Sequence, residues 1–148
     1  MSLHQEYWNK LGNALTNFQF IEESIRMYLH FSYRIVSRKL ENRTPFNFSY
    51  KDVRKESLGT LLEKFEKFNS NTRLIKKIRS LTKERNFIAH RAYLMTSEEQ
   101  KDDKYLSKQI KKIEEIIDKS NKCFYELNKE TEKVSDIFES IKTRGGEP

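Results

Sequence analysis

The chain has 148 residues, of which 36% are hydrophobic and 34% are charged, and it carries a formal net charge of +7 at pH 7. This length suits one domain, no apolar run approaches the length of a membrane span, and the single cysteine, Cys123, excludes an intramolecular disulfide. The basic balance favours polyanionic partners, nucleic acid first, and the absence of a signal-peptide core favours a reducing cytoplasm.

Four glycines and two prolines leave little material for turns, so we expect a few long helices. The first is predicted over Leu3–Leu40, where apolar residues recur every three or four positions. Glu41–Arg54 is predicted to be a connecting loop, because Pro45 cannot continue a helix. The stripe expected to face the core comprises Leu11, Leu15, Phe18, Ile25, Leu29, Ser32 and Val36.

Three more helices are predicted: a short one over Ser57–Phe68, a third over Thr72–Met95 and a long fourth over Asp103–Ile141. Asn69–Asn71 should end the second helix and cap the third, and residues 142–148 should form a flexible tail. The expected fold is therefore a single all-α domain over 1–148, an up-and-down bundle of two long and two shorter helices.

The sequence KERNFIAHRAYL, Lys83–Leu94, places an arginine among apolar positions. On a helical wheel Arg85 lies at the centre of the apolar stripe, and Asn86 and His90 lie beside it, one turn apart. A buried arginine needs a carboxylate partner, and we expect it to be Glu22 or Glu23 of the first helix. Taken separately, a structural ion pair and an ordinary surface histidine would explain these residues.

Two further groups surround this trio on the wheel. Lys76, Arg79 and Lys83 share the side of His90 and form a positive stripe. Phe87 and Leu94 lie almost opposite the core, where exposed apolar side chains indicate a partner surface. If the partner is a second copy of the chain, a two-fold axis there would bring both copies of the polar pair to one cleft.

The segment RNFIAH, Arg85–His90, resembles the R-x4-6-H signature of HEPN domains, the higher eukaryotes and prokaryotes nucleotide-binding family. The resemblance implies a helical bundle and a metal-independent ribonuclease, and a homodimer whose two motifs form one composite site. It also implies a toxin or antiviral-defence effector, in some cases with an antitoxin protein as partner. One branch has the motif R-x4-H-x-Y; here Tyr93 comes one position late, so its modification is not expected.

RNA cleavage suits these residue types. The 2′-hydroxyl is the nucleophile, so the site must move protons and stabilise negative charge on phosphorus. His90 is assigned as general acid/base, Arg85 as phosphate binder and Asn86 as positioning group. No metal or other cofactor is expected, because the three histidines are scattered. The predicted RNA contacts are Lys76, Arg79, Lys83, Arg91 and Tyr93.

One alternative remains open from the sequence. The chain could be a non-catalytic helical dimer module that binds a protein partner or a nucleotide, because basic bundles are common and a motif does not guarantee turnover. A phosphotransfer bundle is disfavoured, since HRAYL supplies neither the lysine nor the glycine expected after its histidine. P-loop and dinucleotide-binding glycine motifs are absent.

Overall fold

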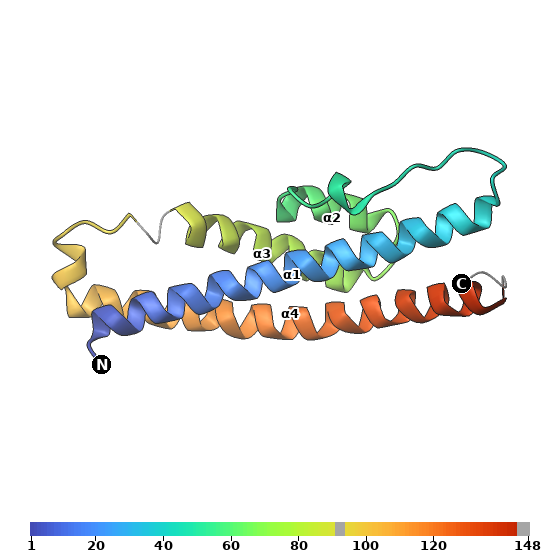
Figure 1. Cartoon of the computed structure of the whole chain (residues 1–148). Coiled ribbons are helices and arrows are strands. Elements are labelled where there is room, and N and C mark those ends of the chain that lie inside the picture. The colour runs from blue at the N-terminus through green and yellow to red at the C-terminus, as the bar shows by residue number, and fades with distance from the viewer. Residues whose placement is uncertain (91–93, 145–148) are drawn as a thin grey trace.

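The computed structural model describes residues 1–90 and 94–144. It contains four α-helices, α1 (Leu3–Leu40), α2 (Leu58–Glu66), α3 (Thr72–His90) and α4 (Asp103–Arg144), and short 3-10 turns at Tyr50–Asp52 and Glu99–Lys101. The helices pack as one bundle (Figure 1), and this described part of the chain has no β-strand. The predicted all-α bundle of two long and two shorter helices is confirmed. The helix α4 continues to Arg144, three residues beyond the predicted end.

The helix starts follow the capping groups in the sequence. Ser2 and Gln5 form a capping box at α1, with Gln5 N–H donating to Ser2 Oγ over 3.2 Å. Asn71 accepts from the Leu74 N–H at 3.1 Å and caps α3, as the NSN segment predicted. The carboxylate of Asp102 accepts the Lys104 and Tyr105 amides and so caps α4 in the same way.

The end of α3 differs from the prediction. The helix was expected to reach Met95 but ends at His90; residues 94–96 are not helical, and 91–93 lie outside the described residues. Thr96 and Glu99 account for the difference, because they cap one another: Glu99 N–H donates to Thr96 Oγ1, and Thr96 N–H donates to Glu99. This capping box starts a new turn and competes with continuation of α3.

The helices α1 and α4 run parallel and form the long seam of the bundle (Figure 1). Their cross-links repeat every seven residues along both helices, which is the spacing of a coiled coil. The links are Lys10–Glu114 at 3.3 Å, Asn17–Asn121 at 2.8 Å and Ser24–Asn128 at 3.0 Å. This polar ladder fixes the axial register of two helices whose apolar residues alone would allow a slip.

The core residues of the two long helices fall in heptad rows. The predicted stripe of α1 contains one complete row, from Leu11 to Ser32. The second buried row of α1, from Tyr7 to Tyr28, was not predicted. The apolar spacing along the fourth helix predicts that Ile117 and Ile137 face the core; instead Ile116 and Phe138 are buried, Ile117 is half-buried and Ile137 is exposed. The buried rows are Leu11/Phe18/Ile25/Ser32 and Tyr7/Ala14/Ile21/Tyr28 on α1, and Leu106/Ile113/Ser120/Leu127/Val134 on α4.

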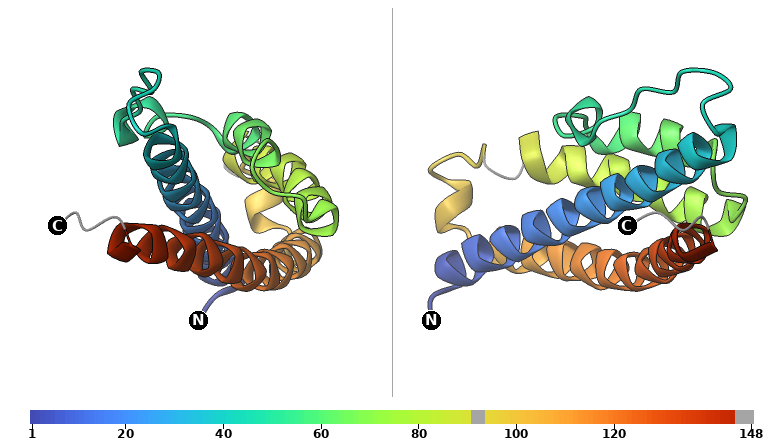
Figure 2. Two further views of the ribbon diagram at one scale, coloured as in Figure 1. Left: turned by 90° about the vertical axis from the view of Figure 1, so that its right-hand side faces the viewer. Right: turned by 45° about the vertical axis from the view of Figure 1, so that its right-hand side comes forward.

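The helix directions do not alternate along the chain, because the connection 41–57 runs back along α1 before α2 begins (Figures 1 and 2). The helix α3 is antiparallel to α4: Lys77 pairs with Glu126 at 2.6 Å, and the later Glu84 pairs with the earlier Lys119 at 2.9 Å. The shorter helices therefore lie along the middle of the α1–α4 pair. The last turn of α3 reaches back toward the N-terminal half of α1.

Cys123 lies in the core, and burial raises the pKa of its thiol to about 12, with the carboxylate of Glu126 adding to the effect. A thiol in this state is protonated at neutral pH and is a poor nucleophile. We expect the native protein to resist a maleimide reagent at pH 7–9, and labelling to appear only as the chain unfolds in urea. Stoichiometric labelling of the native protein within minutes would contradict this burial.

Candidate active site at the end of the third helix

Arg85 lies at the edge of the core rather than at its centre. Its Nε is 3.5 Å from Glu22 Oε1 of α1, and 32% of the side chain is exposed. The neighbours Leu81 and Ile88, on the same face of α3, are fully buried. The expected partner helix is confirmed, and of the two predicted carboxylates it is Glu22 that forms the pair.

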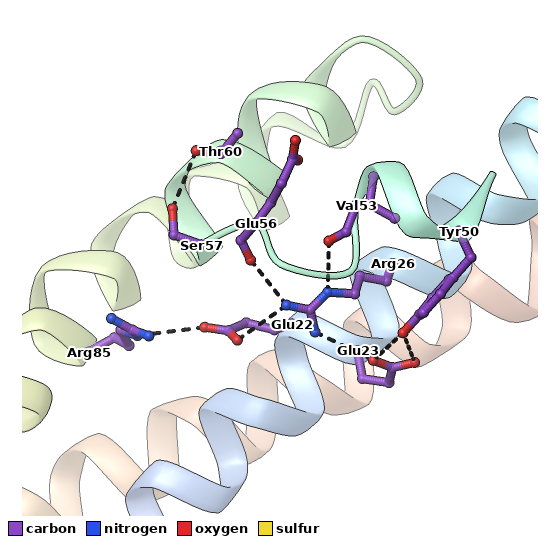
Figure 3. A network of polar contacts seen from close by, with 9 residues as sticks. All are labelled: Glu22, Glu23, Arg26, Tyr50, Val53, Glu56, Ser57, Thr60 and Arg85. Atoms are coloured by element: carbon purple, nitrogen blue, oxygen red, sulfur yellow. Dashed lines mark hydrogen bonds and ion pairs between the residues drawn. The ribbon is translucent and has the colours of Figure 1, made fainter. Parts of the chain in front are cut away.

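The carboxylate of Glu22 also links Arg85 to a second, more buried arginine (Figure 3). Arg26, one turn along α1, lies 3.6 Å from Glu22 Oε2. It donates from Nε to the Val53 carbonyl at 3.1 Å and from Nη2 to the Glu56 carbonyl at 3.0 Å. Arg26 therefore fastens the connection 41–57 to α1 and, through the shared carboxylate, belongs to the same network as Arg85.

Glu23, the other predicted partner, faces a different neighbour. Its carboxylate accepts the Tyr50 hydroxyl at 2.7 and 2.9 Å and pairs with Arg26 at 3.4 Å (Figure 3). Burial, and then the Glu23 carboxylate, raise the pKa of Tyr50. The expectation that Glu23 could hold Arg85 is therefore not met; this residue anchors the connection instead.

Asn86 and His90 are both exposed, and His90 is the last residue of α3. Residues 85–90 span about one and a half helical turns, so the three motif side chains lie within the final part of one rigid element. Among the described residues Glu22 is the only ion-pair partner of Arg85. That pair engages Nε of the guanidinium, and about a third of the side chain is exposed to solvent.

The predicted RNA contacts divide into three groups. Lys76 and Lys83 are exposed on α3. Arg79 forms an ion pair with Glu66 of α2, so its charge is partly compensated within the bundle. Arg91 and Tyr93 lie outside the described residues. The positive stripe predicted on α3 is therefore interrupted in its middle by an acidic neighbour.

The predicted apolar pair also needs a correction. The ring of Phe87 is half-buried and packs against the core, and Lys112 Nζ of α4 lies 3.7 Å from its centroid. Leu94 is 77% exposed and lies after the end of α3. The wheel placed the two on one exposed helical face; that is wrong for Phe87, because α4 packs beside it. Their role in a dimer stays a prediction.

Two residues near the motif were not identified from the sequence. Lys112 covers the ring next to the motif asparagine, and Lys119 holds Glu84, the residue before Arg85, at 2.9 Å. Both belong to α4, and a wheel of α3 alone cannot assign neighbours from another helix. Their signal is the helical spacing of Lys108, Lys112 and Lys119, four and seven residues apart, which places the three lysines on one face of a helix.

Comparison with known proteins adds no assignment: no family model, no curated protein and no solved structure matches this chain. Within residues 1–90 and 94–144, no three His, Cys, Asp or Glu side chains gather in a way that could hold a metal ion. In the same part of the chain no helix combines the length and apolarity of a membrane crossing.

Proposed function

We propose that this protein is a HEPN-type endoribonuclease whose active site contains Arg85, Asn86 and His90. One observation carries the proposal. A half-buried arginine, anchored by the Glu22 carboxylate at 3.5 Å, shares the end of α3 with an exposed amide and an exposed imidazole. This is the combination of a fixed phosphate donor and an accessible proton-transfer group that the resemblance to HEPN domains implies.

The proposed reaction uses the nucleophile that RNA supplies. The 2′-hydroxyl attacks the adjacent phosphorus as a general base accepts its proton, and a general acid protonates the departing 5′-oxygen. His90 serves as this acid/base group. Arg85 donates to the non-bridging phosphate oxygens, where negative charge develops, and Asn86 orients the phosphate. The products are a 2′,3′-cyclic phosphate and a 5′-hydroxyl.

A homodimer would complete the site. One imidazole can transfer both protons only if it changes role within a turnover, whereas two copies supply a separate acid and base. Leu94 supports such an interface because it is 77% exposed and follows the helix that carries the motif. The partner of each protomer would then cover the polar edge of α3, which also explains how a half-buried arginine borders a cleft.

A substitution at Leu94 tests this interface. We expect Leu94→Glu to lower the molar mass in light scattering toward that of one chain, since a carboxylate in an apolar contact loses its hydration. Ile137→Glu is the matched control, because Ile137 is an exposed apolar residue on the last turns of α4. An unchanged mass for Leu94→Glu, or an equal fall for both variants, would count against this surface.

The biological setting follows from the same resemblance. We propose a toxin or antiviral-defence effector that acts on RNA in the cytoplasm and is restrained by an antitoxin protein. Lys76 and Lys83 would hold the RNA backbone, with Arg91 and Tyr93 as further contacts. The net charge of +7 supports this choice of partner.

Cleavage of single-stranded RNA in the presence of EDTA tests the proposed function. We expect the wild type to cut and Arg85→Ala to lose at least about 100-fold in rate, because an arginine that binds the transition-state phosphate contributes several kcal/mol. Arg73→Ala is the control, since Arg73 is an exposed arginine in the first turn of the same helix. RNA binding without cleavage by the wild type would instead support the non-catalytic dimer module.

A further inference from the structure

A second candidate site lies at the other end of α1, where the connection 41–57 leaves the helix. A pocket of about 260 Å³ opens there between the last turns of α1 and the start of the connection. We call it the aromatic–arginine pocket; it is lined by Tyr33, Arg34, Ser37, Arg38, Phe46 and Phe48. The motif residues of α3 do not take part in it.

Stacked aromatic rings form one wall of the pocket. Tyr33 stacks on Phe48 with centroids 3.9 Å apart and planes at 23°, and on Phe46 at 5.7 Å and 30°. The edge of Phe68 supports Tyr33 from the end of α2 at 5.1 Å. Phe46 and Phe48 are only half-buried. Because both rings line the pocket and are partly exposed, a planar ring entering it would meet aromatic side chains.

The other wall is cationic. The guanidinium carbons of Arg34 and Arg38 lie 5.5 and 5.4 Å from the centroid of Phe138 on α4. Cation–π contact with that ring, which is not part of the pocket lining, supports both groups. The described residues that line the pocket include no carboxylate. Two arginines one helical turn apart thus border a ring-stacking surface, with the Ser37 hydroxyl between them in sequence.

We propose that the aromatic–arginine pocket binds one unpaired nucleotide of single-stranded RNA, with its base against the aromatic wall and its phosphate against Arg34. The volume suits one ring system better than a larger ligand, since pockets for such ligands start at about 300 Å³. Stacking on aromatic rings beside arginine is how single strands are bound without a sequence code. A base inside a duplex has both faces stacked on neighbouring base pairs, so the interior of a duplex cannot use this wall.

The pocket would add a second RNA-binding site to the proposed ribonuclease. The identification of the bound RNA as the substrate rests on that proposed function. Arg34 lies twelve positions after Glu22, the partner of Arg85, on the same straight helix. At 1.5 Å per residue this places Arg34 about 18 Å along α1 from Glu22, the anchor of Arg85. A single strand of several nucleotides is long enough to span this axial distance, and the pocket would select unpaired RNA.

Binding is measured by fluorescence anisotropy with a short labelled single-stranded RNA, using the full chain with His90→Ala so that the RNA stays intact. We expect Arg34→Gln to weaken binding about tenfold and Phe46→Leu at least about fivefold. Arg43→Gln is the control, because Arg43 is an exposed arginine on the same connection that pairs with Glu41 outside the pocket. It should change the affinity less than about twofold.

Equal losses of RNA affinity for Arg34→Gln and Arg43→Gln would mean that only the net charge matters, and would overturn the proposed binding site. An unchanged affinity for Phe46→Leu would overturn the base-stacking wall, as would an equal loss on a duplex of the same sequence. A mononucleotide should compete better than inorganic phosphate; equal competition would mark an anion site only and overturn the proposal. Thermal melting confirms that each variant is folded.

The two proposals fail in different ways. Pocket-dependent RNA binding by a wild type that does not cleave would end the ribonuclease proposal and leave the pocket standing. Cleavage that is unaffected by Arg34→Gln, together with unchanged binding, would end the pocket and leave the ribonuclease proposal standing.

Discussion

The variant His90→Ala is expected to lose RNA cleavage by at least about 100-fold, within the range of about 10²–10⁴ that general acid–base catalysis contributes. The imidazole is exposed at the last residue of α3, so no core contact is lost with it. The variant should therefore fold and melt like the wild type. Initial rates on a single-stranded RNA, measured side by side, give the ratio directly.

His4→Ala provides the control for this comparison. His4 is also an exposed histidine on a helix, and its imidazole accepts a hydrogen bond from the Trp8 indole at 3.0 Å. It lies outside the proposed site, so its removal should leave the cleavage rate within about twofold. If both variants cleave RNA at the wild-type rate, His90 is not the acid/base group.

Arg26→Ala is expected to produce the largest loss of stability among the polar substitutions, about 3–5 kcal/mol in the free energy of unfolding. Only 12% of this side chain is exposed, and it satisfies the carbonyls of Val53 and Glu56 while pairing with two carboxylates. Its removal leaves the Glu56 carbonyl without this donor, whereas the Val53 carbonyl still accepts the Glu56 N–H at 3.2 Å. Urea denaturation monitored by circular dichroism measures the change.

Two other arginine variants sharpen that prediction. Arg26→Lys keeps the charge but cannot reproduce the planar set of donors, so it should fall between the wild type and the alanine variant. Arg43→Ala, where 80% of the side chain is exposed and the partner is also exposed, should change stability by less than about 0.5 kcal/mol. A loss below about 1 kcal/mol for Arg26→Ala would mean that the network does not hold the connection.

The helices themselves could be predicted well from the sequence, because their signals are local. Asn71 lies where a cap was expected, and the apolar spacing correctly predicted the extent of α1. The end of α3 was misplaced because apolar periodicity continues to Met95 while the Thr96–Glu99 capping box competes with it. Capping groups thus decided the boundary against periodicity.

The pairing of the helices was harder to predict. The parallel α1–α4 seam depends on Asn17, Ser24 and Asn128, which a hydrophobicity pattern treats as solvent-facing. Ser120 is also polar, and it is fully buried in that seam. A row of small polar residues at seven-residue spacing is a usable signal only when two helices are compared together. The hydrophobicity pattern of one helix alone cannot detect this row.

The candidate site could likewise be predicted only in part from the sequence. Arg85 could be identified because it lies among the apolar positions of α3. Because an unpaired buried arginine is costly, a carboxylate of the first helix was expected beside it, and Glu22 is that partner. Phe87 was misassigned because its cover comes from Lys112, on a helix far along the chain. The branched network through Arg26 was not predicted, since backbone carbonyls of an irregular connection leave no trace in the sequence.

The chemical nature of the new 3′ end tests the central claim most directly. Cleavage by the RNA's own 2′-hydroxyl predicts that mass spectrometry of the upstream fragment finds a 2′,3′-cyclic phosphate, and that one 2′-deoxy nucleotide at the scissile position blocks cutting there. A 3′-hydroxyl on that fragment, or cutting that persists at the 2′-deoxy position, would contradict the account.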